Sequence, residues 1–158
     1  MKNILIAGAF LMAISVLLGA FGAHALKNSL TPEMLAVYTT AVQYQFYHSL
    51  GLLLIGLIGY HVKSKWINWS GILLFVGIIL FSGSLYALSI TGIKVLGAIT
   101  PIGGVAFVAG WICLAMGILK TTNHWPLTTF SWSFSYLYCV KSAFFRDLKR
   151  TFIFYILK

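Results

Sequence analysis

The sequence predicts an all-α membrane protein that folds as a four-helix transmembrane bundle, and two observations lead to this fold class. The chain of 158 residues carries 11 Lys or Arg and only 2 Asp or Glu, and it is 60% hydrophobic, whereas about a quarter of the residues in a soluble domain are charged. The charges also bound four uncharged runs of 24 to 29 residues. Because a transmembrane helix needs about 20 apolar residues, each run is long enough to cross a bilayer. The predicted spans are 4–26, 36–60, 67–91 and 97–119, within a transmembrane domain formed by residues 1–123.

The first span, 4–26, also has features of a secretory signal peptide. One Lys precedes an apolar run, and residues 23–25 (Ala-His-Ala) have the small-X-small pattern of a cleavage site. The uncharged run of 24 residues is longer than the usual signal core of about 7 to 15 residues. In addition, Gly8, Gly19 and Gly22 suit close packing between transmembrane helices. We therefore expect this helix to be retained.

Turn and capping residues lie where the other three helices should meet water. Residues 31–33 (Thr-Pro-Glu) supply an N-cap, a proline in the first turn and an acid near the positive end of the helix. Trp66 and Trp69 provide an interfacial anchor at the start of the third helix. Residues 91–92 (Thr-Gly) favour a left-handed glycine cap at its end. Residues 100–101 (Thr-Pro) favour a capped start for the fourth helix.

The distribution of Lys and Arg predicts that both termini are cytoplasmic. Four spans place Lys27 and Lys94 on one side of the membrane. The other side carries nine cations: Lys2, Lys63, Lys65, Lys120, Lys141, Arg146, Lys149, Arg150 and Lys158. Cytoplasmic loops carry the excess of basic residues in membrane proteins, and without the C-terminal tail the count still favours this side by four to two.

The C-terminal tail, residues 124–158, differs in kind from the four spans. From Phe130 to Tyr138 aromatic and serine residues nearly alternate, a period of two that does not fit a helix. We expect an irregular segment at the cytoplasmic interface, with its cations on anionic lipid head groups. A terminal extension without a role is the alternative.

Polar residues within the spans are few. If the spans are antiparallel, these residues lie in the half of the membrane opposite the termini. The distribution of Lys and Arg identifies this as the outer half. We therefore predict a polar pocket or network there. The candidate residues are His48, Gln45, Tyr44, Gln43, Ser82, Tyr86, His24 and Thr100. His48 is the one imidazole deep in a span, which makes it a functional candidate, while a packing hydrogen bond to a neighbouring helix is its structural alternative.

Several classes of function are excluded by the residues that the spans lack. No acid lies within a predicted span, so a carboxylate proton relay, an intramembrane aspartyl protease and a carboxylate-bridged di-metal site lack their essential groups. No Ser-His-Asp set or phosphate-binding glycine motif is present. Cys113 and Cys139 are too few for a disulfide framework or a zinc site. We expect no enzyme activity, metal or cofactor, and no nucleic-acid partner, because a basic recognition module is missing.

Five motifs, in order along residues 1–123, resemble the YgdD/YwdK-like family of small bacterial inner-membrane proteins of unknown function. These motifs are GAFGAHAL at 19–26, TAVQYQFYHSL at 40–50, LFSGSLYAL at 80–88, ITPIGG at 99–104 and Gly-Trp at 110–111. The resemblance implies a multi-pass protein of the bacterial inner membrane with a retained first helix. It brings no catalytic residue, cofactor or substrate, and the chain departs from the family pattern from about Pro126 onward.

The sequence leaves three functional hypotheses. The first is a non-enzymatic membrane protein that binds a small molecule, a lipid or a partner helix in the outer-half polar pocket. The second is a small transporter or channel subunit that works as a homo-oligomer, with Gly51, Gly56, Ala106 and Gly110 as contact surfaces. The third is an enzyme that uses His48 as a base.

The predicted orientation is open to a direct test. A single cysteine introduced between Lys63 and Lys65, in a variant that lacks the native cysteines, should be labelled by a membrane-impermeant maleimide only after the cells are opened. A cysteine beside Lys94 should be labelled in intact cells. Labelling of the 63–65 connection from outside would reverse the assigned topology.

Overall fold

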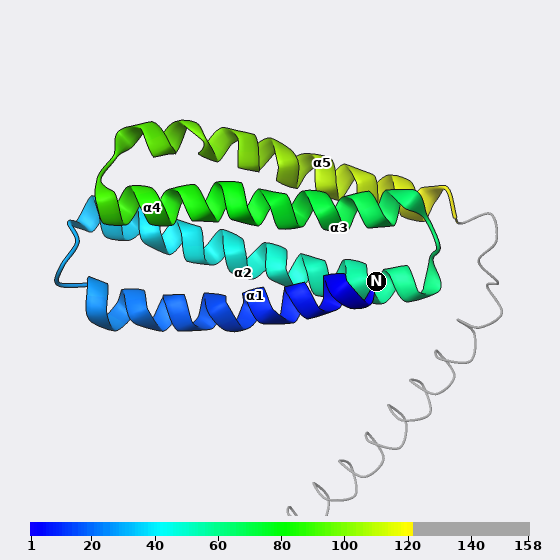
Figure 1. The fold of residues 1–158 in the computed structure, drawn as a ribbon, viewed down its shortest axis with the longest axis horizontal. Coiled ribbons are helices and arrows are strands. Elements are labelled where there is room, and N and C mark those ends of the chain that lie inside the picture. The colour runs from blue at the N-terminus through cyan, green and yellow to red at the C-terminus, as the bar shows by residue number, and fades with distance from the viewer. Residues whose placement is uncertain (122–158) are drawn as a thin grey trace, which may run out of the picture. The chain divides into compact units, whose positions relative to one another are not determined.

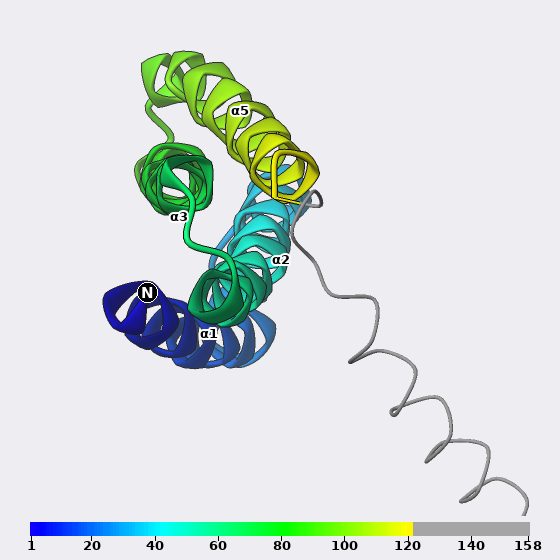
Figure 2. The same ribbon diagram turned by 90° about the vertical axis from the view of Figure 1, so that its right-hand side faces the viewer.

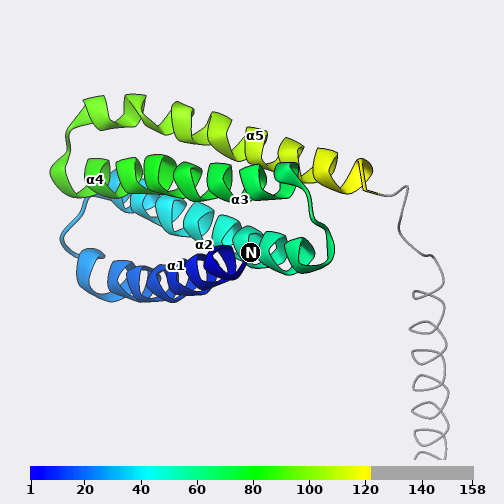
Figure 3. The same cartoon turned by 45° about the vertical axis from the view of Figure 1, so that its right-hand side comes forward.

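The computed structural model describes residues 1–121, which form an antiparallel bundle of helices (Figures 1 and 3). The helices that it describes are α1 (Lys2–Phe21), α2 (Pro32–His61), α3 (Lys65–Gly77), α4 (Gly83–Thr91) and α5 (Thr100–Leu119). Three short segments join or extend them: the π-helices η1 (Gly22–Leu26) and η2 (Ile78–Ser82) and the 3₁₀-helix η3 (Lys94–Ala98). The predicted tail, residues 124–158, lies outside the described residues.

Within residues 1–121, four continuous helical stretches are long and apolar enough to cross a membrane: Lys2–Leu26, Pro32–His61, Lys65–Thr91 and Lys94–Leu119. The predicted all-α fold with four membrane-spanning helices is therefore confirmed. Each stretch starts two to four residues before the corresponding predicted span, and the 3₁₀ turn η3 accounts for the early start of the last one.

Two of the predicted helix ends have the expected local chemistry. The Thr31 hydroxyl accepts a hydrogen bond from the Met34 amide at 3.3 Å, with Pro32 in the first turn of α2. Gly92 ends α4 in the left-handed conformation, with φ at 71°. A side chain is strained in that conformation, so glycine at this position lets the chain turn sharply out of the helix.

The four stretches pack as a chain of neighbours. α1 lies along α2, α2 also contacts α3 and α4, and α5 packs along α3, which gives the arc of helices seen end-on in Figure 2. The connection at 27–31 and the turn from α4 to α5 lie at one end, and the N-terminus and the 62–64 connection lie at the other (Figure 1).

Small residues let these helices approach closely, and this corrects the proposed oligomer contacts. A Cβ atom at Gly51 would lie 2.9 Å from the Leu74 side chain, and one at Gly56 would lie 2.5 Å from the Leu5 side chain. Gly110 meets Leu74 in the same way, and Ala106 is half-buried. In lipid, where helices gain little from burying apolar surface, such close van der Waals contact drives association. The three glycines are therefore used inside the bundle.

The contact between α5 and η2 is the tightest of these approaches to a backbone. A Cβ atom at Gly103 would lie 2.5 Å from the Phe81 amide nitrogen, and a backbone cannot yield as a flexible side chain can. Gly83 offers a matched position, because it is also helical but has no atom within 4 Å of its Cβ site.

We expect Gly103→Ala to destabilise the protein by about 1 to 3 kcal/mol, because α5 must move away from η2. Gly83→Ala should be neutral or stabilising by up to about 1 kcal/mol, since alanine favours the helix and meets nothing. Unfolding in mixed detergent micelles, followed by circular dichroism, measures both. Equal stabilities for the two variants would contradict the close approach.

Candidate functional site

A hydrogen-bonded chain of polar groups crosses the bundle from α4 through α2 to α1. The Tyr86 hydroxyl of α4 donates to Gln45 Oε1 of α2 at 2.9 Å, and Gln45 Nε2 donates to the Leu11 carbonyl of α1 at 3.0 Å. Gln45 is 3% exposed, and these two hydrogen bonds give both the oxygen and the nitrogen of its amide a partner within the protein. Three helices are joined through one buried side chain.

Tyr38 makes a second link between α2 and α1. Its hydroxyl donates to the Leu18 carbonyl at 3.0 Å, and its ring lies 5.1 Å from the Tyr86 ring at a tilt of 59°. Buried aromatic pairs prefer such tilted arrangements. Tyr38 therefore extends the Gln45–Tyr86 link toward the end of the bundle that carries the 27–31 connection.

His48 lies in an aromatic stack between α2 and α5. Its ring is stacked on Phe107, with ring centroids 3.4 Å apart and planes at 12°. Its Nδ1 lies 2.8 Å from the Tyr44 carbonyl, and because a carbonyl only accepts hydrogen bonds, this contact requires the proton on Nδ1. Tyr44 stacks in turn on Phe81 at 4.4 Å. The His48 hydrogen bond stays within α2, so it is not the bond to a neighbouring helix that the sequence offered as the structural alternative. The stacked ring of Phe107 joins His48 to α5 instead.

Ser84 and Thr100 join α4 to α5. Their hydroxyls lie 2.9 Å apart, and Ser84 also donates to the Phe81 carbonyl at 3.0 Å. This corrects the expectation that Thr100 caps α5, because the residue before the helix is Ile99 and no side chain caps that end. At that end the Ile102 and Gly103 amides donate to the Ile99 carbonyl, and the Thr100 hydroxyl bonds across the helix interface to Ser84.

The eight predicted site residues thus do not form one cluster in the structure. Gln45 and Tyr86 bond directly, Tyr44 and His48 belong to the aromatic stack, and Thr100 bonds Ser84. Ser82 is fully buried, and its hydroxyl has no hydrogen-bond partner among the described residues. His24 and Gln43 are exposed on the surface of the bundle and make no hydrogen bond or ring contact with the others.

Several participants were not predicted. Tyr38 lies seven residues before Gln45 and therefore shares its helix face, a spacing that could have found it. Ser84 carries no such signal, because the π-helical turn η2 just before it alters the helical phase of its side chain. The Leu11 and Leu18 carbonyls are backbone groups, which a search for polar side chains does not reach.

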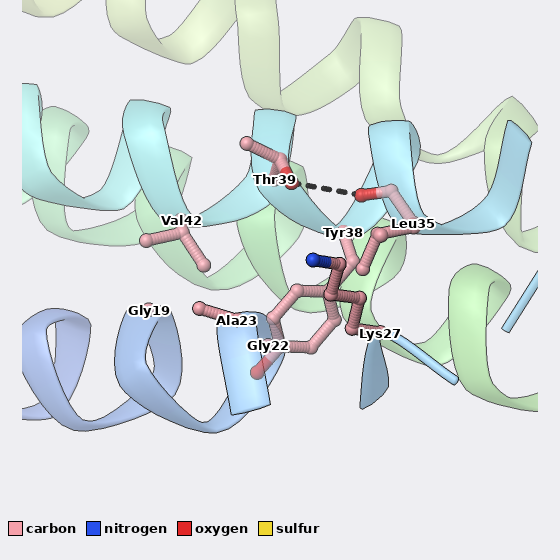
Figure 4. Close-up of a pocket in the computed structure, with 8 residues that line it drawn as sticks. All are labelled: Gly19, Gly22, Ala23, Lys27, Leu35, Tyr38, Thr39 and Val42. Atoms are coloured by element: carbon pink, nitrogen blue, oxygen red, sulfur yellow. Dashed lines mark hydrogen bonds between the residues drawn. The ribbon is translucent and has the colours of Figure 1, made fainter. Parts of the chain in front are cut away.

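A groove lies beside Tyr38, between α1–η1 and the first half of α2 (Figure 4). It has a volume of about 380 Å³, within the usual range for ligand sites. Gly19, Gly22 and Ala23 form one wall and Leu35, Tyr38, Thr39 and Val42 the other, with Lys27 at one end. Within residues 1–121, no three His, Cys, Asp or Glu side chains converge to hold a metal ion.

The four apolar spans and their internal polar links define a multi-pass membrane protein. Residues 18–104 match the family described as "Protein of unknown function (DUF423)". The chain is 46% identical over 121 residues to the UPF0382 membrane protein YwdK of Bacillus subtilis, across 76% of this chain and 98% of that protein. It is 52% identical over 120 residues to the UPF0382 membrane protein SSP2132 of Staphylococcus saprophyticus, across 76% of this chain and 99% of that protein.

The chain therefore belongs to this DUF423/UPF0382 family of membrane proteins, as the YwdK-like resemblance predicted. It is a multi-pass bacterial membrane protein. The relatives' names state no activity, and no solved structure matches the chain.

Removing the Tyr86 hydroxyl should test the polar chain. We expect Tyr86→Phe to destabilise the protein by about 1 kcal/mol, because it leaves Gln45 Oε1 buried without a donor. A double-mutant cycle with Gln45→Leu should give a coupling energy between about 0.6 kcal/mol, the average for hydrogen bonds between transmembrane helices, and about 1.7 kcal/mol, the maximum. Tyr60→Phe is the control, since Tyr60 is 52% exposed. Zero coupling in the cycle would contradict the bond.

Proposed function

We propose that the chain is a membrane-embedded binding protein that holds an anionic lipid in the groove between α1 and α2. The observation that carries this proposal is the groove's composition, with mainly apolar walls and one cation, Lys27, at its end. We place the site in the groove instead of in the polar cluster predicted around His48, because the hydrogen-bonding groups and ring faces of that cluster are largely used within the bundle. Tyr38 belongs to both the groove and the polar chain.

The electrostatics of the groove favour a negatively charged ligand. Glu33 is the one acid in residues 1–121, and Lys27 forms no ion pair with it or with any other described residue. Figure 4 shows the Lys27 side chain reaching back beside Tyr38 along the groove. A lysine near a helix end places its ammonium at head-group level while its methylene stem stays in apolar surroundings. The lipid phosphate would pair with this ammonium.

The walls suit an acyl chain. Gly19, Gly22 and Ala23 leave room beside α1, and Leu35 and Val42 face that room from α2. Gly22 cannot be enlarged without displacing Tyr38, because a Cβ atom there would lie 2.6 Å from the Tyr38 ring. A groove that opens along the surface of a membrane bundle lets the rest of the lipid remain in the bilayer.

Replacing the cation should weaken lipid binding. In native mass spectrometry of the full chain, we expect the wild type to retain an anionic phospholipid, and Lys27→Gln to lower the bound fraction roughly three- to tenfold. Lys94→Gln is the matched control, because Lys94 lies at the same end of the bundle but outside the groove. Equal losses in both variants would show general surface charge instead of a site.

A larger side chain in the groove tests lipid binding independently of charge, with the same native mass spectrometry. Ala23→Leu should remove the lipid adduct, whereas Ala20→Leu, an exposed position one turn earlier that does not line the groove, should keep it. Binding from phosphatidylcholine vesicles or from inorganic phosphate should be weaker than from phosphatidylglycerol vesicles. A wild type without any lipid adduct contradicts the proposal, and solute uptake by reconstituted vesicles would favour the transporter hypothesis instead.

A further inference from the structure

One face of α2 is unpartnered among the described helices, although it carries a polar side chain inside the span. The exposed residues recur at intervals of four and three, and they are Gln43, Tyr47, Leu50, Leu54 and Leu57. We call this row the α2 seam. In the end-on view of Figure 2, the described helices lie in an arc that leaves one side of α2 uncovered. The spacing of the seam is the heptad repeat by which helices pack in left-handed pairs.

Gln43 lies too deep for its amide to reach water. α2 has 30 residues, and at 1.5 Å per residue Gln43 is about 16 Å from the start of the helix. With a hydrocarbon core of about 30 Å centred on α2, Gln43 lies roughly 9 Å below the nearer boundary. Only two methylene groups separate its amide from the backbone, so the side chain cannot extend to the head groups.

The exposed amide therefore requires a partner that neither lipid nor the described part of the chain provides. Gln43 makes no hydrogen bond within residues 1–121, and acyl chains have no donors or acceptors. Unsatisfied polar groups are costly in hydrocarbon. Polar side chains at such positions join transmembrane helices, which indicates that the seam is covered in the membrane.

We infer that a second copy of this chain covers the α2 seam and that Gln43 bonds Gln43 of that copy. An amide carries both a donor and an acceptor, so it is its own complement. All copies that insert with one topology are related by rotation about the membrane normal, and a twofold axis of this kind brings identical residues together at the same depth. Tyr47 and the three leucines then continue the contact along the helix.

This interface differs from the small-residue contacts that the sequence predicted for an oligomer. Gly51 and Gly56 pack against Leu74 and Leu5 of other helices in the bundle, and neither belongs to the seam. The seam uses large side chains that are 46% to 58% exposed, namely Tyr47, Leu50, Leu54 and Leu57. The groove residue Thr39 lies one turn before Gln43, but none of the five seam residues lines the groove, so variants at the seam test the dimer separately from lipid binding.

Disulfide cross-linking tests the seam in native membranes. In a full-length Cys113→Ser, Cys139→Ser background, single cysteines at positions 43, 47, 50 and 54 should form a dimer band on mild oxidation. Phe10→Cys and Val108→Cys are the controls, because both residues are exposed within spans on other helices. Cross-linking of the controls to the same extent, no band from any seam position, or a product that is not twice the mass of the chain would each overturn the inference.

The role of the amide has its own measurement. Gln43→Leu should weaken dimerisation in liposomes roughly three- to twentyfold, as measured by energy transfer between labelled copies. Because the side chain is exposed, the variant should keep the wild-type circular dichroism and its lipid adduct. An unchanged dimer affinity would overturn the Gln43 pairing, and this result would leave the lipid groove unaffected.

Discussion

The structure depends on the absence of water from the interior of a bilayer. Every polar group that enters the hydrocarbon must find its partner within the protein, and backbone groups do so by forming helices. The same demand governs the side chains. Gln45 satisfies both ends of its amide across two interfaces, and Tyr38 bonds a backbone carbonyl of α1. These bonds fix which helices are neighbours, because apolar surface alone does not distinguish one helix from another in lipid.

Polar links and close packing act together at these interfaces. Glycines at Gly8, Gly56 and Gly103 allow backbones to approach to contact, and a hydrogen bond between side chains is short only when its helices are near. Among residues 1–121, four buried serine hydroxyls are exceptions to the demand for a partner, namely those of Ser15, Ser49, Ser70 and Ser82. They fit the packing pattern as small side chains that permit close approach. Serine at a helix interface thus serves by its size even where its hydroxyl is not bonded.

The sequence predicted the fold well because the spans are set by length and hydropathy, which are local properties. Thr31 and Gly92 also end their helices as predicted, since capping depends on one or two residues. The partners of each polar residue could not be predicted in the same way, because they depend on helix rotation. His24 and Gln43 share the membrane half of the cluster yet face outward. The position of Ser84 depends on a π-helical turn that no composition signal marks, and Thr100 bonds it instead of capping a helix.

That π-helical turn, η2, divides the third span into two helical registers. A turn closed by hydrogen bonds to the fifth residue contains one residue more than an α-helical turn, and each residue of an α-helix turns the chain by about 100°. If the same five residues of Ile78–Ser82 were wound as a regular α-helix, α4 would be rotated by about that angle. Ser84 and Tyr86 would then point away from Thr100 and Gln45. The single extra residue in this turn therefore sets the rotation of α4 about its axis, and with it the direction of every side chain through which α4 contacts its neighbours.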